Sequence, residues 1–272
     1  MKELALYNLK EGMVLAKDIT TPSGQVVLEK GKELTKQSIL RLSFYNIKSA
    51  CIVDGEEKQA APKSYSQKIK TSQKFQSFQV DHTIVLSQIR VSFEGYVNEG
   101  KPLDTSALLS KVVELFQSCK TSLELFNMLH NMHSSDDSVY VHSLNVSLIC
   151  RQIGKWIKAD DATLDMLTLA GLLHDIGKLK IPTELLNKPG KYTDEEFAQV
   201  RLHTQYGYEL LKPLPLDAHI KLAALSHHER CDGTGYPNGL TTNDIDPYAR
   251  VVAIADVYDA MTTARSYRAP LC

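Results

Sequence analysis

Ionisable residues interrupt the most apolar segments in the C-terminal part of this chain, and this combination restricts how those segments can fold. Residues 172–176 read Leu-Leu-His-Asp-Ile, and Asp256 follows the apolar run 251–255. A buried imidazole or carboxylate is costly unless it is paired, hydrogen-bonded or bound to a metal. These segments must therefore pack together in a way that gives their ionisable groups partners.

From residue 104 onward the pattern is helix after helix, with no strand alternation of any length. Asp104 or Thr105, and Thr193 or Asp194, are suited to helix starts, and Pro and Gly cluster between the expected helices. The predicted helices span 104–118, 121–132, 137–156, 160–176, 193–212, 216–228 and 247–264. The sequence predicts a mainly α fold, with an all-helical domain over 104–272.

A small β-rich module is predicted over residues 1–56. Residues 14–16 and 26–28 flank a polar turn at 21–24, which indicates a hairpin. A short helix is expected over 35–42 with Thr35 as its N-cap, followed by a strand at 50–53.

Residues 57–103 are predicted to form a polar linker that runs into an amphipathic helix at about 74–97. Its apolar residues recur at mixed three- and four-residue steps: Phe75, Phe78, Ile84, Leu86, Ile89 and Phe93. Pairing of two copies into a homodimer through this helix is a hypothesis, because the heptads are irregular.

Composition excludes several classes of function. The net charge is −1, so no global basic field favours a long nucleic acid, and any phosphate must be held by local charges. No apolar run approaches the ~18–20 residues of a membrane span, and the start lacks the apolar core of a signal peptide. The five cysteines are odd in number and form no CxxC pair. We therefore expect reduced thiols and a cytoplasmic protein.

Two doublets of metal-type residues, His174-Asp175 and His227-His228, carry the chemistry. Neighbours on a helix point about 100° apart. Each doublet could therefore serve two ions set ~3.5–4 Å apart, or one ion and a substrate. His174-Asp175 taken alone could also be a hydrogen-bonded pair at a helix end. With single ligands from other helices, the doublets predict a dinuclear site. Nitrogen and oxygen ligands favour Fe or Mn, while Mg, Zn and Ni remain open.

Three basic residues and a glycine-rich loop could serve a phosphate ligand. Lys178 lies one turn beyond His174, and Arg265 and Arg268 are one turn apart. Each could instead be an ordinary surface cation. In residues 232–237, Asp-Gly-Thr-Gly-Tyr-Pro, the glycines permit positive φ and close approach to a ligand, and Tyr236 offers a ring and a hydroxyl.

Residues 227–237 read His-His-Glu-Arg-Cys-Asp-Gly-Thr-Gly-Tyr-Pro, which resembles the HHExxDGxGYP signature of the HD-GYP phosphodiesterases. Residues 173–178, Leu-His-Asp-Ile-Gly-Lys, resemble that family's HD motif. Further similar segments occur in order, at 142–146, 201–207, 256–262 and 265–268. The stretch 9–16 is similar to a small module often found ahead of such domains.

The resemblance implies an HD-type phosphohydrolase domain and a role for each matching residue. Implied metal ligands are His142, His174, Asp175, His203, His227, His228 and Asp256, with Asp175 bridging two divalent ions. Implied phosphate contacts are Lys178, Arg265 and Arg268, and implied substrate contacts are Gly235 and Tyr236. Lys178, His174 and Asp175 are the expected catalytic residues, while Glu229, Asp232 and Asp259 are expected to support ligands or shape the loop.

The sequence departs from the family pattern at two places. Some members carry a glutamate one turn before the first histidine to support a third metal. This chain has Ser138 there, which favours two metals, and Asp136 and Asp137 lie off that face. The family domain usually continues with further helices, so the domain is expected to be short at its C-terminus, which ends at Cys272. His82, His130, His133 and His219 match no motif and are expected to be structural or surface residues.

The implied activity is hydrolysis of a cyclic dinucleotide, cyclic di-GMP or the hybrid cyclic GMP-AMP, to a linear dinucleotide or to mononucleotides. In this mechanism a metal-bound hydroxide attacks phosphorus in line with the leaving ribose oxygen. Two alternatives remain: a catalytically inactive module that binds a cyclic dinucleotide, and a broader HD-type phosphohydrolase that acts on mononucleotides. The Gly-Tyr-Pro loop argues against the second.

Overall fold

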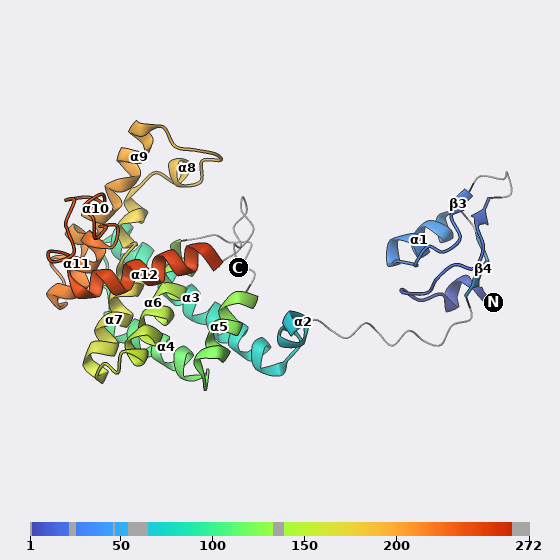
Figure 1. Cartoon of the computed structure of the whole chain (residues 1–272), viewed down its shortest axis with the longest axis horizontal. Coiled ribbons are helices and arrows are strands. Elements are labelled where there is room, and N and C mark those ends of the chain that lie inside the picture. The colour runs from blue at the N-terminus through green and yellow to red at the C-terminus, as the bar shows by residue number, and fades with distance from the viewer. Residues whose placement is uncertain (1, 22–25, 46, 54–64, 133–138, 263–272) are drawn as a thin grey trace. The chain divides into compact units, whose positions relative to one another are not determined.

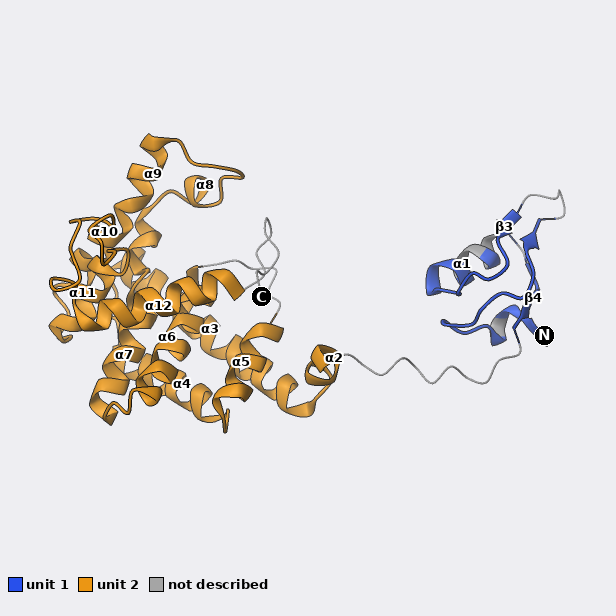
Figure 2. Ribbon diagram, viewed as in Figure 1, with its two compact units in different colours: residues 1–63 blue, residues 64–272 orange. Residues whose placement is uncertain are grey.

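The computed structural model describes residues 2–21, 26–45, 47–53, 65–132 and 139–262 of the 272-residue chain. It divides into two compact units, Met1–Lys63 and Ser64–Cys272 (Figure 2). The helix expected at 74–97 therefore belongs to the second unit, which begins at Ser64.

The first unit is a small β-rich module with one helix. Strand β1 (Lys2–Ala5) leads into a short 3₁₀ helix (Leu6–Asn8) and pairs antiparallel with β4 (Ser49–Ile52), while β2 (Ile19–Thr20) pairs with β3 (Val26–Leu28). Helix α1 (Lys36–Phe44) starts after Thr35, whose hydroxyl accepts from the Ser38 N–H as expected for an N-cap. Buried Leu15, Leu34 and Leu42 form the centre of its core.

The hairpin expected between residues 14–16 and 26–28 has a different first strand. Ile19 and Thr20 pair with β3 instead. The Leu15 N–H donates to the Lys32 carbonyl and the Ala16 N–H to the Cys51 carbonyl. The segment 14–16 thus lies between the loop that follows β3 and strand β4, and apolar pattern alone did not reveal these partners.

The described residues of the second unit form helices joined by loops, with one isolated β-bridge between Asp232 and Thr241 (Figure 1). This confirms the predicted mainly α fold. Its helices are α2 (Tyr65–Lys70), α3 (Gln73–Glu99), α4 (Thr105–Gln117), α5 (Ser122–Asn131), α6 (Val139–Trp156), α7 (Asp161–Leu173), α8 (Thr183–Leu186), α9 (Asp194–Arg201), α10 (His203–Leu211), α11 (Ala218–Ser226) and α12 (Pro247–Thr262). Within the described ranges, none of these helices combines the length and apolarity that crossing a bilayer requires.

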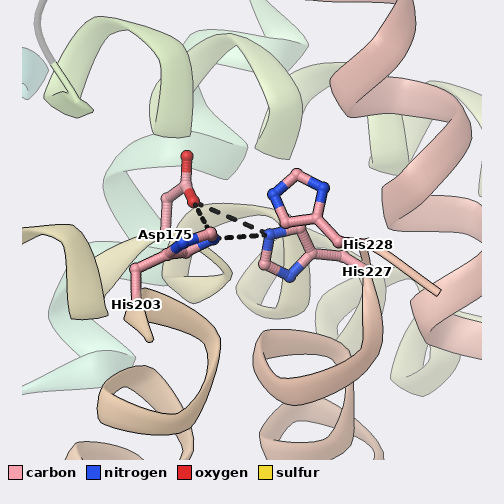
Figure 3. A group of neighbouring side chains, drawn as sticks. All are labelled: Asp175, His203, His227 and His228. Atoms are coloured by element: carbon pink, nitrogen blue, oxygen red, sulfur yellow. Dashed lines mark hydrogen bonds and ion pairs between the residues drawn. The ribbon is translucent and has the colours of Figure 1, made fainter. Parts of the chain in front are cut away.

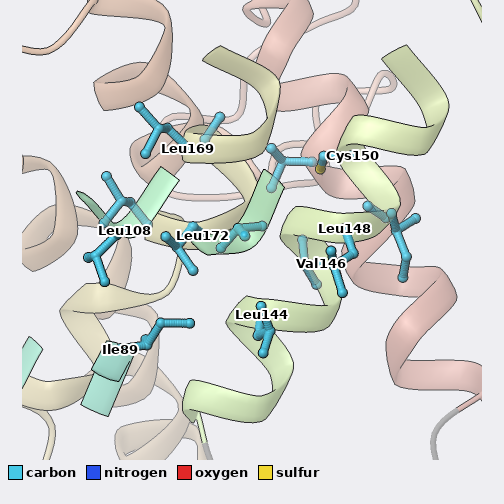
Figure 4. Packing of buried hydrophobic residues seen from close by; sticks show 14 of the residues in the cluster. Ile89, Leu108, Leu144, Val146, Leu148, Cys150, Leu169 and Leu172 are labelled. Carbon is cyan, nitrogen blue, oxygen red and sulfur yellow. The ribbon is translucent and has the colours of Figure 1, made fainter. Parts of the chain in front are cut away.

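Helix α6 lies at the centre of this unit, and every residue from Tyr140 to Gln152 is buried. Leu144 and Leu148 pack with residues of α3, α4 and α7 in one continuous core (Figure 4). A Cβ at Gly171 would lie 2.9 Å from the Ser147 Cα, so this glycine lets α7 approach the α6 backbone closely. Because α6 is enclosed on all sides, its polar side chains must find partners inside the protein.

The amphipathic face expected on 74–97 is used within the second unit itself. Phe75, Phe78, Ile89 and Phe93 are buried in the core, whereas Ile84 is exposed together with Val80 and Val91 on another face of α3. Pairing of two copies through α3 stays a prediction.

Two predicted helices end or break where ligand-type residues occur. The helix expected over 160–176 ends at Leu173 and is followed by a 3₁₀ helix, Ile176–Lys180. The helix expected over 193–212 is two helices, because α9 ends at Arg201 and α10 begins at His203. Hydrophobic periodicity runs through both points, so neither interruption could be predicted from it.

Gly177 packs directly against the start of α10. A Cβ added there would lie 1.9 Å from the His203 carbonyl oxygen and 2.4 Å from the Gly207 nitrogen, which are both backbone atoms that cannot rotate away. The close approach of the 3₁₀ helix to α10 therefore requires glycine at this position.

We predict that Gly177→Ala lowers the free energy of unfolding by about 3 kcal/mol, at the upper end for overpacking. Urea denaturation measures this loss. Gly207→Ala is the matched control, because its Cβ would meet neighbours only at 3.5 Å or more. Equal stability of the two variants would contradict the close approach.

Candidate metal centre

The seven predicted metal ligands come from five separate places in the helical unit. His142 lies on α6, His174 and Asp175 follow α7, His203 begins α10, His227 and His228 follow α11, and Asp256 lies on α12. The structure brings six of them into two groups that share Asp175. The first group adds His203, His227 and His228 (Figure 3), and the second adds His142 and His174. Asp256 borders the second group, with its Oδ1 3.0 Å from His142 Nε2.

The helix ends explain why adjacent residues can serve one group. Helix α11 ends at Ser226, so His227 and His228 are not neighbours within a regular helix, and their ring centroids lie 4.2 Å apart. From the sequence, this doublet could serve two ions, or one ion and a substrate. In the structure both imidazoles lie in the same group of potential ligands, and the division of the doublet stays a prediction.

Three of the histidines are held in the same way at helix ends. The Nδ1 of His174 bonds to the Gly171 carbonyl at 2.7 Å, and that of His203 to the Val200 carbonyl at 2.6 Å. The Nδ1 of His227 bonds to the Ala224 carbonyl at 3.1 Å. Each carbonyl belongs to the residue three positions earlier, at the end of a helix where carbonyls lack intrahelical partners.

These bonds determine the tautomer of each ring. A carbonyl oxygen can only accept, so each Nδ1 carries the proton and each Nε2 carries a lone pair. His142 follows the same rule, because its Nδ1 lies 2.8 Å from Asp259 Oδ2. Three imidazoles, those of His174, His203 and His227, thus present unprotonated Nε2 atoms to the interior of the site, the form in which histidine binds a metal. The bond to Asp259 turns the Nε2 of His142 toward the same interior.

The inward-facing atoms are all acceptors. His203 Nε2 and His227 Nε2 lie 3.4 Å apart, yet neither can donate, because both rings carry their proton on Nδ1. Asp175 Oδ1 lies 3.4 Å from the first and 3.7 Å from the second. Three atoms whose lone pairs face one another in a buried space repel one another unless a cation lies among them.

The two oxygens of Asp175 face different groups. While Oδ1 faces His203 and His227, Oδ2 lies 3.2 Å from His174 Nε2 and 3.6 Å from His142 Nε2. His142 Nε2, His174 Nε2 and Asp175 Oδ1 are buried without a hydrogen-bond partner among the described residues. Such orphaned polar atoms are rare in native proteins, and a missing ion is one of their recognised causes. The residues present therefore fit two cations that share one carboxylate.

The electrostatics of the site keep most ligands in their metal-binding form. Burial lowers the pKa of His174, lowers that of His203 to about 3, and also lowers that of His228, so these rings stay neutral. Burial alone would raise the pKa of Asp175, but His174 and Lys178 hold it well below its ordinary value.

His142 differs from the other histidines of the site. Burial lowers its pKa, but the carboxylates of Asp256 and Asp259 outweigh burial and raise the pKa to about 9. A proton and a metal ion therefore compete for its Nε2.

An aromatic stack covers one side of the first group. Tyr236 stacks on His228 with ring centroids 4.7 Å apart, and the Arg201 guanidinium lies 4.5 Å from the centre of the Tyr236 ring. Tyr236 thus contacts both a ligand-type imidazole and a cation. Arg201 was not among the predicted site residues, because two positions before His203 it looks like any basic residue of an exposed helix.

The loop that carries Tyr236 is shaped by its own backbone and by Glu229. The buried Glu229 carboxylate accepts from the Asn238 N–H at 2.7 Å and the Leu240 N–H at 2.9 Å. Gly233 has a φ of +78°, as expected for one of the two glycines. Gly235 has no positive φ; instead a Cβ there would lie 2.4 Å from the Glu229 Cα, so this glycine permits close approach to the chain, and its contact with a substrate stays a prediction.

The expected phosphate contacts are only partly within the described residues. Lys178 Nζ lies 2.5 Å from Asp175 Oδ2, so this lysine contacts the shared carboxylate rather than His174. Arg265 and Arg268 lie outside the described residues, as do Asp136, Asp137, Ser138 and His133. Asp232, expected to shape the loop, accepts from the N–H and the hydroxyl of Thr234.

Comparison with known proteins finds phosphodiesterases among the relatives of this chain. A cyclic di-GMP phosphodiesterase of Pseudomonas aeruginosa is 39% identical over 170 residues, which cover 62% of this chain and 41% of the relative. A 3′3′-cGAMP-specific phosphodiesterase of Vibrio cholerae is 38% identical over 154 residues, 56% of this chain and 30% of the relative. The chain thus spans less than half the length of either relative.

A solved structure shares the fold. Bd1817, a HDG"Y"P protein from Bdellovibrio bacteriovorus, matches with a TM-score of 0.56 and 18% identity over 98% of this chain and 90% of its own. The resemblance to HD-GYP proteins inferred from the motifs is confirmed. Because residues 110–272 match the family model described as HD domain, the chain belongs to the HD domain family.

Proposed function

We propose that this chain is a metal-dependent phosphodiesterase that hydrolyses a cyclic dinucleotide, cyclic di-GMP or 3′3′-cGAMP, in second-messenger signalling. The observation that carries the proposal is Asp175, whose two oxygens face two different sets of unprotonated imidazole nitrogens. Two ions held by one carboxylate are the arrangement that phosphoryl-transfer hydrolases use. The names of the relatives support the choice of a cyclic dinucleotide as substrate.

The proposed ligands are His142, His174, Asp175, His203, His227, His228 and Asp256. When bound, two divalent ions lower the pKa of a water molecule and offset negative charge on phosphate oxygens. Both groups consist of imidazoles and carboxylates without cysteine among the described residues, and such a donor set favours Fe or Mn over softer metals.

The surrounding residues supply charge and orientation. Lys178 is the cation in contact with the shared carboxylate, and there it would also offset the charge of a phosphate beside the ions. Tyr236, whose ring contacts His228 and Arg201, is the proposed contact for a base or ribose of the substrate. Arg265 and Arg268 remain proposed phosphate contacts on sequence grounds alone.

We predict that the metal-free chain binds two Mn²⁺ ions and that Asp175→Asn weakens both binding steps by more than about tenfold. The reason is that Asp175 faces both groups, so its charge serves both ions. Calorimetric titration measures the two affinities. His142→Ala is expected to weaken one step only, and His219→Gln, a histidine bonded to Asp246 outside both groups, should weaken neither. A loss confined to one step in Asp175→Asn would contradict the shared carboxylate.

The substrate is tested with cyclic di-GMP and 3′3′-cGAMP side by side, on anaerobically purified protein with Mn²⁺ or Fe²⁺ added. We predict a linear dinucleotide or mononucleotide product with metal present, and none after combined replacement of His174 and Asp175 by Ala. Chromatography separates the products, and His219→Gln should keep normal turnover. No turnover of either compound, with two metals bound, would favour the inactive binding module, and hydrolysis of mononucleotides alone would favour the broader phosphohydrolase.

The stack around Tyr236 gives a further prediction. Tyr236→Phe keeps the ring between His228 and Arg201 and should change KM less than about threefold, which corresponds to less than 1 kcal/mol. Tyr236→Ala removes the ring and should raise KM at least about tenfold, in the range of a lost base stack. Steady-state kinetics distinguishes the two. Equal KM values for both variants would show that the ring has no part in substrate binding.

A further inference from the structure

A chain of polar side chains leads from the metal ligand His142 to a helix that does not reach the site. Asp259 on α12 accepts from His142 Nδ1 at 2.8 Å through one oxygen, and from the Asn145 amide at 3.0 Å through the other. The Asn145 oxygen lies 3.4 Å from Nε2 of His82, on α3. All four residues are buried, and His82 is only 2% exposed.

The direction of every hydrogen bond in this series of polar side chains follows from the Asp259 carboxylate at its centre. An ionised carboxylate only accepts, so His142 and the Asn145 amide nitrogen must both donate to Asp259. The Asn145 amide therefore presents its oxygen to His82, which must donate from Nε2. Burial lowers the pKa of His82, which favours the neutral ring with one proton that this assignment requires.

Packing alone does not account for a histidine at this position. The buried neighbours of His82 along the same face of α3 are Phe78, Val85 and Ile89, and a further apolar side chain would complete that face. The Nδ1 of His82 is buried without a hydrogen-bond partner in the described part of the chain. An unsatisfied buried polar atom costs about 1–3 kcal/mol, so the imidazole lowers stability where an apolar residue would not.

We propose that His82 is a positioning residue for metal binding. Through Asn145 and Asp259 it holds the His142 ring in the orientation that presents Nε2 to the site, so α3 contributes to metal affinity without touching a ligand atom. The inference rests on the proposed function only in requiring that the two groups bind metal; it does not require turnover of any particular substrate.

The test measures Mn²⁺ affinity of the metal-free full-length chain by calorimetric titration. His82→Leu, which removes the donor, should weaken one of the two binding steps about tenfold, the low end for partners outside the metal ligands. His82→Gln keeps an N–H donor on a side chain of similar reach and should restore affinity to within about twofold of the original chain. Phe78→Leu perturbs packing on the same face of α3 but leaves the polar chain intact, so its Mn²⁺ affinity should not change.

A double-mutant cycle separates the polar chain from general loosening of the core. If His82 acts through Asn145, then His82→Leu should have little further effect on Mn²⁺ affinity once Asn145→Ala is present. Thermal unfolding of each metal-free variant verifies that it is folded at the titration temperature.

Two results would overturn the inference: unchanged Mn²⁺ affinity in folded His82→Leu, or a loss as large in His82→Gln and Phe78→Leu as in His82→Leu. Failure of the proposed function looks different. In that case the chain would turn over no cyclic dinucleotide, while the affinity differences among the His82 variants would persist.

Discussion

The bond from a histidine Nδ1 to the carbonyl three residues earlier is the interaction on which the site depends. It occurs at the ends of α7, α9 and α11, where His174, His203 and His227 follow the last turns. At each place it satisfies a carbonyl that has lost its helical partner, and it also fixes the ring with Nε2 inward. The same bond thus completes the end of a helix and orients a potential metal ligand. This explains why these three histidines lie where helices end, whereas His142 and Asp256 lie within α6 and α12.

This arrangement concentrates acceptors in a space that the fold cannot neutralise by itself. Asp175, His203 and His227 point lone pairs at one another from 3.4 to 3.7 Å. Lys178 brings a positive charge to the shared carboxylate, and it is bonded to one of its two oxygens. The surrounding core of α3, α6, α7 and α12 is tightly packed, so it holds the acceptors in place against their repulsion. The repulsion among these acceptors lowers the stability of the folded protein locally, but it leaves them preorganised for binding, as is common at functional sites.

Much of this could be predicted from the sequence, because motif residues and helical periodicity are local signals. The helical class, the N-cap at Asp104 and the convergence of the ligand-type histidines follow from such signals. The break at Leu202 and the end of α7 could not be predicted, since side-chain bonds to carbonyls leave no trace in an apolar pattern. Arg201 and His82 were missed for a related reason: their partners, Tyr236 and Asn145, are distant in sequence and adjacent only after folding.

The contact between His142 and Asp259 also has a consequence for the order in which the protein acquires its site during synthesis. The two residues are separated by 117 positions, and both Asp256 and Asp259 lie on α12. Chains are made from the N-terminus, and helices pack as they emerge from the ribosome. Helices α6, α7, α10 and α11 therefore emerge before α12, and until α12 has been made His142 lacks the carboxylate that sets its ring. A truncated chain without α12 lacks both Asp256 and Asp259, so its second group is incomplete.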